Sequence, residues 1–338
     1  MNVLTDLHHR DLYYSLHCLF EKRLGFHLYR PEGNAWLADG YWTMGECPVG
    51  HHLMNQYLRN GVGENMLTPH NREEDGVAYV WNETHQYHAK CIDIDKFKSM
   101  KFDIIIPSHP AHYESWKKLR DDHQPQAVFM PHVGNVSTIL ETDFIIRSVP
   151  FPGKCQKDVL VHQEINTSIY KHVSPPAGTQ KIHSVTNGYH FQNLYQTYKQ
   201  ALPECEFRYY GGAGCPDGVL DLHGVAGKMQ EASLGWSTKA MGGLGHSNMG
   251  WMHSGRPILT NMTEHRAYGE CALKLFEPGV TCIDLDAGSV NTNTKLIRQW
   301  LHPEMIAKHG ALCVDRFHEV INYEEEANQV KQLLSDIL

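Results

Sequence analysis

The chain has 338 residues, of which 41% are hydrophobic and 20% charged, the proportions of a soluble globular protein long enough for two domains. Its 30 basic and 38 acidic residues give a formal net charge of -8, so overall electrostatics do not favour a nucleic-acid-binding protein. No apolar run approaches the roughly 18 residues of a membrane span, and the start lacks the pattern of a signal peptide. Nine cysteines without a C-x-x-C pair predict reduced thiols and a cytoplasmic protein. The 24 histidines show no zinc-ligand spacing, so no metal site is predicted.

The first half of the chain begins with strand, helix and strand. A short apolar strand at 2–5 is followed by a polar loop, by apolar residues at helical spacing over 12–24, and by a strand at 26–29. The other strands expected in this half are 77–81, 102–107, 127–130, 144–146 and 159–161. This succession predicts a doubly wound α/β domain, without the G-x-G-x-x-G fingerprint of a dinucleotide site. The D-x-D triplet at 93–95 is interpreted as a strand or loop edge rather than a metal site.

Three strands of this half end in loops that carry histidines. His9, with Asp11 close behind it, follows the first strand, and His109 and His132 follow two later ones. The carboxyl ends of parallel strands meet at one edge of the sheet, where ligands bind in open α/β folds. We therefore expect these side chains to lie close together.

The second half repeats the α/β succession after a linker at 171–180, KHVSPPAGTQ. Strands are expected at 181–186, 206–210, 234–236, 258–259, 272–276 and 280–285, and helices at 194–201, 224–232, 291–300, 303–317 and 323–337. The predicted domains are 1–172 and 173–320. Residues 321–338 are predicted to form a C-terminal helix that packs back across the domain junction by its apolar face.

The stretch 234–261, LGWSTKAMGGLGHSNMGWMHSGRPILTN, has the pattern of strand, glycine-rich loop, short helix, turn and strand. Glycines let the backbone adopt positive φ and approach a ligand closely. The start of the following helix presents unpaired N–H groups, which suit a phosphate. We therefore predict an anion site formed by Gly243, Gly245, His246, Ser247 and Asn248.

This stretch resembles the donor-binding segment of GT-B glycosyltransferases. The usual pattern there is E-G-F-G, about seven residues, and E-A-M-A-x-G-x-P-V-I. Its glycine frame is matched by Gly243, Gly245, Gly255 and Pro257. The two glutamates, which in the family usually contact the sugar and the donor ribose, are replaced by Gly242 and Gly250. Segments 166–170 and 277–285 resemble further motifs in the family's order, so the resemblance covers nearly the whole chain.

The resemblance implies two Rossmann-like domains facing each other across a cleft, with a UDP-sugar as the expected donor on the second. It implies no permanently bound cofactor and no required metal. Asn187 and Gly188, at the end of the second domain's first strand, and Lys239 would join the glycine-rich loop in holding the diphosphate.

On the first domain the resemblance implies an acceptor hydroxyl that needs activation. His9 or Asp11 is the candidate general base, and His109 and His132 would position the sugar or the acceptor. The residues do not decide between inversion and retention.

The variant resembles divergent glycosyltransferases of bacteriophages, some of which glycosylate modified DNA bases. The acceptor expected is therefore either a 5-hydroxymethyl pyrimidine in phage DNA, in the host cytoplasm, or a saccharide or small molecule. Two alternatives of different class stay open. One is a sugar-nucleotide 2-epimerase of the same fold, and the other is a non-catalytic protein that binds a nucleotide sugar or nucleic acid.

Overall fold

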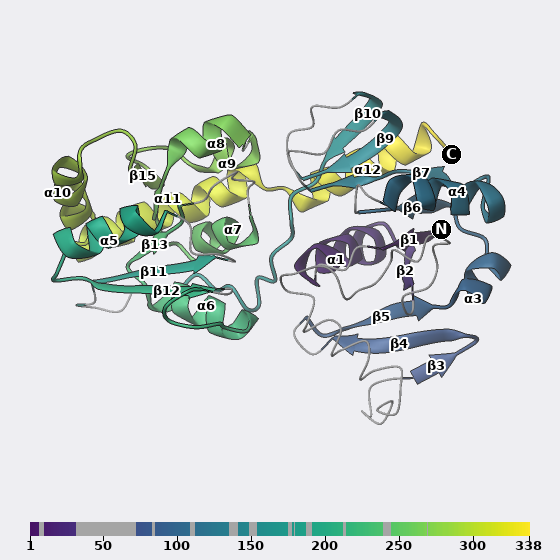
Figure 1. The fold of residues 1–338 in the computed structure, drawn as a ribbon, viewed down its shortest axis with the longest axis horizontal. Helices are drawn as coiled ribbons and strands as arrows, with labels where there is room; N and C mark the ends of the chain where they lie inside the picture. Colours follow the sequence, from purple (N-terminus) through teal and green to yellow (C-terminus); the bar gives the residue numbers. More distant parts are fainter. Residues whose placement is uncertain are drawn as a thin grey trace. The chain divides into compact units, whose positions relative to one another are not determined.

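A computed structural model describes residues 1–6, 10–31, 72–82, 85–108, 112–134, 141–148, 154–174, 178, 180–186, 191–211, 214–238, 245–268 and 270–338. The chain divides into two compact units (Figure 1). The first comprises Met1–Glu164 and Tyr323–Leu338, and the second comprises Ile165–Asn322. Among the described residues, no helix is both long and apolar enough to cross a membrane.

The first unit contains a seven-stranded sheet with the order β3-β4-β5-β2-β1-β6-β7 (Figure 1). Its strands are β1 (Asn2–Thr5), β2 (His27–Pro31), β3 (Arg72–Glu74), β4 (Val77–Asn82), β5 (Tyr87–Ile92), β6 (Ile104–Ile106) and β7 (Val128–Phe129). From β5 to β7 all neighbours pair in parallel, whereas β3 and β4 form an antiparallel edge. The parallel strands follow the order third, second, first, fourth, fifth, which is that of a Rossmann fold with its switch point between β1 and β6.

Helices cover both faces of this sheet. They are α1 (Arg10–His17), continued by the π-helix η1 (Cys18–Arg23), α3 (Ile94–Ser99), α4 (Tyr113–His123) and α12 (Tyr323–Ser335). Because side chains alternate along a strand, Val3 packs with α1, η1 and α12, and Leu4 packs with α3 and α4. A smaller parallel sheet, β10-β9-β8, consists of β8 (His132–Val133), β9 (Glu141–Arg147) and β10 (Lys154–Leu160).

The strands expected from apolar runs are confirmed in this unit, but β3, β5, β8 and α3 were not predicted. The interpretation of residues 93–95 as a strand or loop edge is wrong. Asp93 is the N-cap of α3, and its carboxylate accepts a hydrogen bond from the backbone N–H of Lys96. Capping of this kind is a common reason for an aspartate immediately before a helix.

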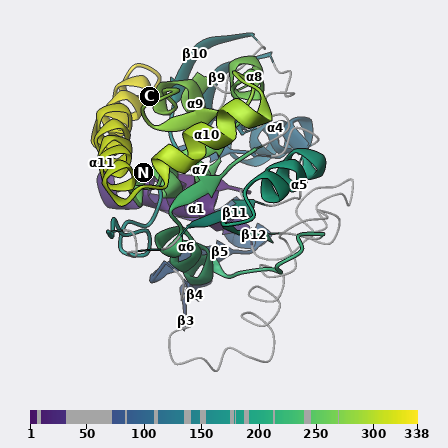
Figure 2. The ribbon, with the colours of Figure 1, turned by 90° about the vertical axis from the view of Figure 1, so that its left-hand side faces the viewer.

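The second unit contains a five-stranded, fully parallel sheet with the order β12-β11-β13-β14-β15, of which Figure 2 labels β11 and β12. Its strands are β11 (Lys181–Thr186), β12 (Glu206–Gly211), β13 (Leu234–Trp236), β14 (Ile258–Thr260) and β15 (Cys282–Asp284). The order second, first, third, fourth, fifth places its switch point between β11 and β13. These five strands and their order along the chain were predicted correctly, but the further strand expected at 272–276 is wrong, because the helix α9 (Glu270–Leu275) occupies this segment.

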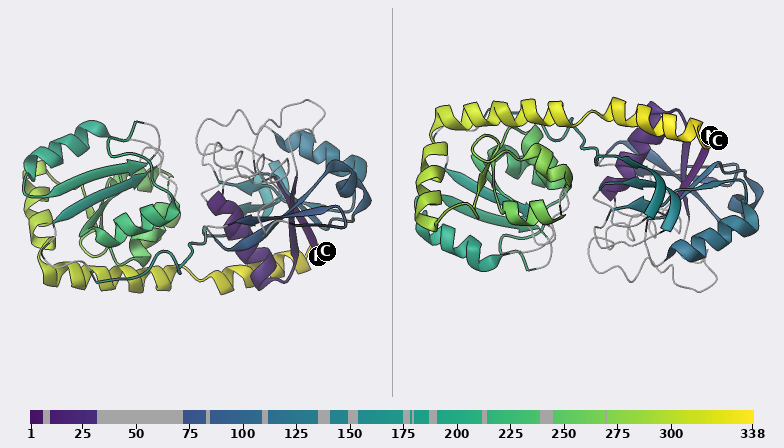
Figure 3. Two further views of the ribbon diagram at one scale, coloured as in Figure 1. Left: turned by 90° about the horizontal axis from the view of Figure 1, so that it is seen from below. Right: turned by 90° about the horizontal axis from the view of Figure 1, so that it is seen from above.

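Helices also cover both faces of the second sheet (Figure 3). They are α5 (Gln192–Ala201), α6 (Leu222–Glu231), α7 (His246–His253), α8 (Met262–Tyr268), α9 (Glu270–Leu275), α10 (Val290–Trp300) and α11 (Pro303–Val320). Side chains of α5 and α10 pack with Trp236 and Leu259 in one aromatic-rich core.

The last helix, α12, belongs to the first unit through apolar packing and one polar clamp. Ala327, Val330 and Leu334 join the core around α1. The Glu326 carboxylate is buried, accepts the backbone N–H of His162 at 2.8 Å, and lies 2.6 Å from His162 Nδ1.

Replacing Glu326 with alanine should destabilise the protein, because the buried N–H of His162 loses its acceptor. We expect a loss of about 1 to 3 kcal/mol in the free energy of unfolding, measured with urea. Gln329→Ala, an exposed position of the same helix, is the control and should change it by less than about 0.5 kcal/mol. Equal stability of the two variants would contradict a clamping role for Glu326.

Candidate functional site

The switch point of the second unit lies where β11 and β13 end. Ligands of open α/β sheets bind at such a point, outside the carboxyl ends of the strands. β11 ends at Thr186, and β13 is followed by Ser237 and Thr238, which are fully buried. Of the predicted donor-site residues, Asn187 and Gly188 come directly after β11, and Lys239 and Gly243 follow β13. These four lie outside the residues that the structure describes.

The predicted residues that the structure does describe form the start of α7. Gly245 is its N-cap, with φ 64° and ψ 134°, a conformation in which a side chain would be strained. Having no side chain, it cannot cap the helix, whereas α3, α6 and α10 are capped by their own Asp93, Asp221 and Ser289. The N–H groups of the first turn of α7 therefore have no side-chain cap from the N-cap position, which favours an anion there.

A network of buried polar groups fixes the position of this helix start. Asn248 is fully buried, and its Oδ1 accepts a hydrogen bond from Ser237 Oγ. Thr260, at the end of β14, donates to the Ser237 carbonyl at 2.7 Å. Asn248 thus joins α7 to the strand ends from inside, while His246 and Ser247 are partly exposed beside it.

Tyr170, the last residue of the segment 166–170 that resembles a family motif, lies against this helix. Tyr170 is 1% exposed, and its hydroxyl is 3.4 Å from His246 Nδ1. The same ring lies beside Gly250, where a Cβ would come within 2.8 Å of Tyr170 Cε1 and 3.0 Å of Met229 Sδ. Only glycine fits, so the position that carries a glutamate in the GT-B pattern is filled by the tyrosine ring.

Gly250→Ala should therefore destabilise the protein by about 1 to 3 kcal/mol, because the buried Tyr170 ring cannot move aside. Gly227→Ala is the matched control: it also lies inside a helix, and a Cβ added there would have open space within 4 Å. That control should be stabilised by about 0.5 to 1 kcal/mol through helix propensity. Thermal unfolding of both variants measures the contrast, and a neutral Gly250→Ala would show that the helix can shift.

Of the four site residues predicted in the first unit, only His132 has a side chain that the structure describes. β1, β6 and β7 are neighbours in the sheet, so the loops that follow them begin at one edge. His9 and His109 lie outside the described residues, and Asp11 is described only by its backbone in α1. His132 lies in β8 and is 3% exposed, with Nε2 3.1 Å from Ser148 Oγ.

A buried carboxylate at this edge, that of Asp6, is not part of any recognisable sequence motif. Asp6 follows β1 and is 2% exposed. Its Oδ1 accepts hydrogen bonds from Ser108 N at 2.6 Å and Ser108 Oγ at 2.8 Å, and its Oδ2 accepts one from Trp116 Nε1 at 2.8 Å. Asp6 thereby ties the end of β1 to the loop after β6 and to α4. Burial raises its pKa from 3.8 to about 6, against the opposing effect of these donors.

Because the pKa of Asp6 is higher in the folded state, folding takes up a proton as the pH falls through 6. Above that pH the buried carboxylate is ionised and lowers the free energy of unfolding, and below it protonation removes this destabilisation. Relative to Asp6→Asn, the wild type should gain about 1 kcal/mol of unfolding free energy between about pH 7 and pH 5. The exposed Asp121→Asn provides the control. A difference that does not change with pH would rule out a raised pKa.

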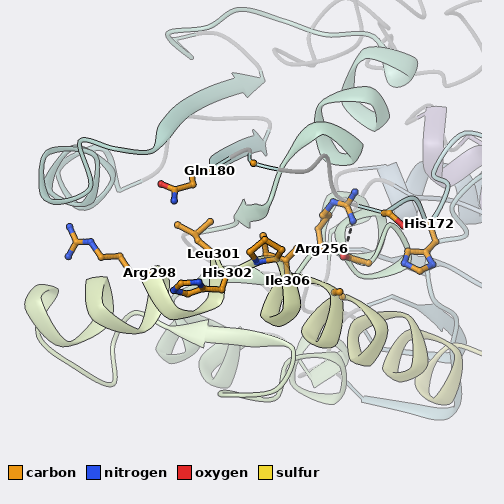
Figure 4. Close-up of a pocket in the computed structure, with 13 residues that line it drawn as sticks. His172, Gln180, Arg256, Arg298, Leu301, His302 and Ile306 are labelled. Carbon is orange, nitrogen blue, oxygen red and sulfur yellow. Dashed lines mark hydrogen bonds between the residues drawn. The ribbon is translucent and has the colours of Figure 1, made fainter.

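The structure also contains a cavity of about 440 Å³ in the second unit (Figure 4). Its walls include Gln180, just before β11, and Arg256, just before β14, so it lies at the amino ends of the strands. The Arg256 guanidinium is fully buried and donates to the carbonyls of Gln230, Ser254 and Gly255. The cavity is therefore separate from the switch point and its candidate anion site. Among the described residues, no group of three His, Cys, Asp or Glu side chains could hold a metal ion.

No protein-family model matches the sequence, and no curated protein matches it. Several solved structures are similar to the structure of this chain. HepE of Anabaena in complex with UDP is 9% identical, with a TM-score of 0.59 over 99% of both chains. A mutant of S. aureus TarM in complex with fondaparinux, α-GlcNAc-glycerol and UDP is 8% identical, with a TM-score of 0.58 over 98% of this chain and 99% of that one. The lipopolysaccharide outer core galactosyltransferase WaaB is 10% identical, with a TM-score of 0.57 over 97% and 98%. The prediction of two Rossmann-like domains is confirmed: the chain has the GT-B fold.

Proposed function

We propose that this protein is a glycosyltransferase that moves a sugar from a nucleotide-sugar donor, a UDP-sugar, to an acceptor hydroxyl. The observation that carries the proposal is the glycine-started α7 at the switch point of the second unit. The fold supports it, because WaaB is a galactosyltransferase, and HepE and TarM were solved with UDP.

In this proposal the first turn of α7 holds the diphosphate. Its backbone N–H groups and the positive end of the helix dipole stabilise the charge that develops on the leaving group. The buried hydrogen bond between Ser237 and Asn248 fixes the start of α7, so its N–H groups are already ordered before the reaction. Asn187, Gly188, Lys239 and Gly243 would complete the phosphate site.

The acceptor side belongs to the first unit. His9 or Asp11 would remove the proton of the acceptor hydroxyl, and Asp6 would position the loops on which His9 and His109 lie. His132 is buried and bonded to Ser148, so it would act by holding β8 and β9 together. The acceptor is either a hydroxymethylated base of phage DNA, reached in the host cytoplasm, or a saccharide or small molecule.

The direct test is thermal unfolding with UDP and with other nucleoside diphosphates. A ligand present at about 100 times its dissociation constant stabilises a protein by about 2.7 kcal/mol. We expect a selective shift with UDP. Transfer from UDP-sugars to a panel of acceptors that includes hydroxymethylated DNA would then identify the acceptor. No shift with any nucleotide would contradict the donor site, and binding without turnover would favour a non-catalytic protein.

Ser247→Glu separates helix stability from donor binding. A negative charge in the first turn should stabilise α7 by about 0.3 to 1 kcal/mol in the free protein. The same charge should repel a diphosphate and weaken UDP binding by about tenfold. Ser247→Gln, which has the same shape without the charge, is the control. UDP affinity unaffected by the glutamate would place the phosphates elsewhere.

A further inference from the structure

Arg30 is a buried cation in the first unit. It lies near the end of β2 and is 5% exposed. In the sheet, β2 pairs with β1 and β5, and Arg30 lies opposite Cys91 of β5. The residue is therefore at the carboxyl edge of the parallel strands, where ligands of such sheets bind.

The guanidinium of Arg30 has no acidic partner among the described residues. Within that part of the chain its Nε also has no hydrogen-bond acceptor, and the guanidinium lies over the ring face of Tyr13, 5.2 Å from the centroid. Three carboxylates in the described part of the same unit that are buried or partly buried have other partners. Asp6 accepts from Ser108 and Trp116, Glu21 pairs with His17 and Lys90, and Glu164 pairs with Arg23.

An unpaired buried charge is costly, since the lost hydration is not replaced by an opposite charge. Arg256, which is fully buried in the second unit, also has an Nε without an acceptor among the described residues, but its guanidinium donates to three carbonyl groups. Arg30 has no comparable set of acceptors in the described part of the first unit. Contacts among the described residues therefore do not account for its charge, whereas a bound anion would.

The start of α1 provides a second feature that favours an anion at the same place. α1 begins at Arg10, four residues after Asp6, and Tyr13 is its fourth residue. Because Arg30 stacks on Tyr13, its positive charge is close to the helix end that carries the positive dipole. The same end lies beside the switch point between β1 and β6.

We propose that Arg30 and the first turn of α1 bind an anionic group, a phosphate or a carboxylate. This assignment rests on the proposed function, in which the anionic group belongs to the acceptor. The acceptor is then an anionic molecule, and the first unit binds its charge while its hydroxyl reacts. The diphosphate of the donor is the other anionic group that this site could bind. Stabilisation of Arg30→Met by UDP distinguishes the two.

The test uses the full chain, inorganic phosphate and the substitution Arg30→Met. Thermal unfolding is followed during a phosphate titration at constant ionic strength, with sodium chloride as the salt control. We expect phosphate to stabilise the wild type, and Arg30→Met to weaken phosphate binding by about tenfold or more. Arg298→Met is the matched control: Arg298 is exposed, is paired with Glu204 in the second unit, and should leave the titration unchanged.

A second readout distinguishes ligand binding from a structural role. Without phosphate, Arg30→Met should unfold at the same temperature as the wild type or a higher one, because a buried charge without a partner has been removed. A lower unfolding temperature together with an unchanged phosphate titration would overturn the proposal. So would a wild type that shows no phosphate-specific shift.

UDP identifies the source of the anion. If UDP stabilises Arg30→Met as much as the wild type, the site serves the acceptor, as proposed. If the variant loses both phosphate and UDP binding, the assignment to the acceptor is overturned. A wild type that binds phosphate through Arg30 but no nucleotide would contradict the proposed glycosyl transfer and leave the anion site standing.

Discussion

Close packing around α7 is the constraint on which the candidate donor site depends. A Cβ at Gly235 of β13 would collide with the Trp251 ring of α7, and one at Gly250 would collide with Tyr170. Behind the helix, the backbones of Gly255 and Gly310 approach so closely that a Cβ at Gly310 would lie 2.6 Å from the Gly255 carbonyl oxygen. Glycines at these contacts let α7 pack tightly against its surroundings, so its first turn has a fixed position at the strand ends.

The same packing explains how this chain differs from the GT-B pattern. In that pattern a glutamate projects from the position of Gly250, but here that space belongs to the Tyr170 ring. The tyrosine hydroxyl lies next to His246, a partly exposed residue of the first turn. The position that has a carboxylate in the pattern is therefore occupied by an aromatic ring whose hydroxyl lies beside His246 at the start of α7.

The sequence could predict features that depend on local pattern. Apolar runs such as 104–106 identified strands, and the spacing of Gly245, Gly255 and Pro257 identified the strand, loop and helix of the second unit. β5 was missed because its sequence, YHAKCI, has polar residues on a strand whose charged Lys90 pairs with Glu21.

Features that depend on contacts between distant residues could not be predicted. Asp6 is an isolated aspartate in the sequence, and its three hydrogen bonds come from residues more than 100 positions away. Tyr170 is 80 positions from Gly250, and no pattern links them. In the sequence, Arg30 is simply the residue after the strand expected at 26–29, and only its burial and its lack of an acidic partner among the described residues distinguish it.

The return of α12 to the first unit has a consequence for the order of folding. Val330 and Leu334 belong to the same core as Val3 and Tyr13, and Arg23 forms an ion pair with Glu324. During synthesis, the first unit leaves the ribosome without the helix that covers this part of its core. The whole second unit must be translated before α12 can dock, whereas the second unit is a continuous segment that can fold as soon as it emerges. The first part of the chain to be made is thus the last to be completed, with apolar surface exposed to chaperones in the interval.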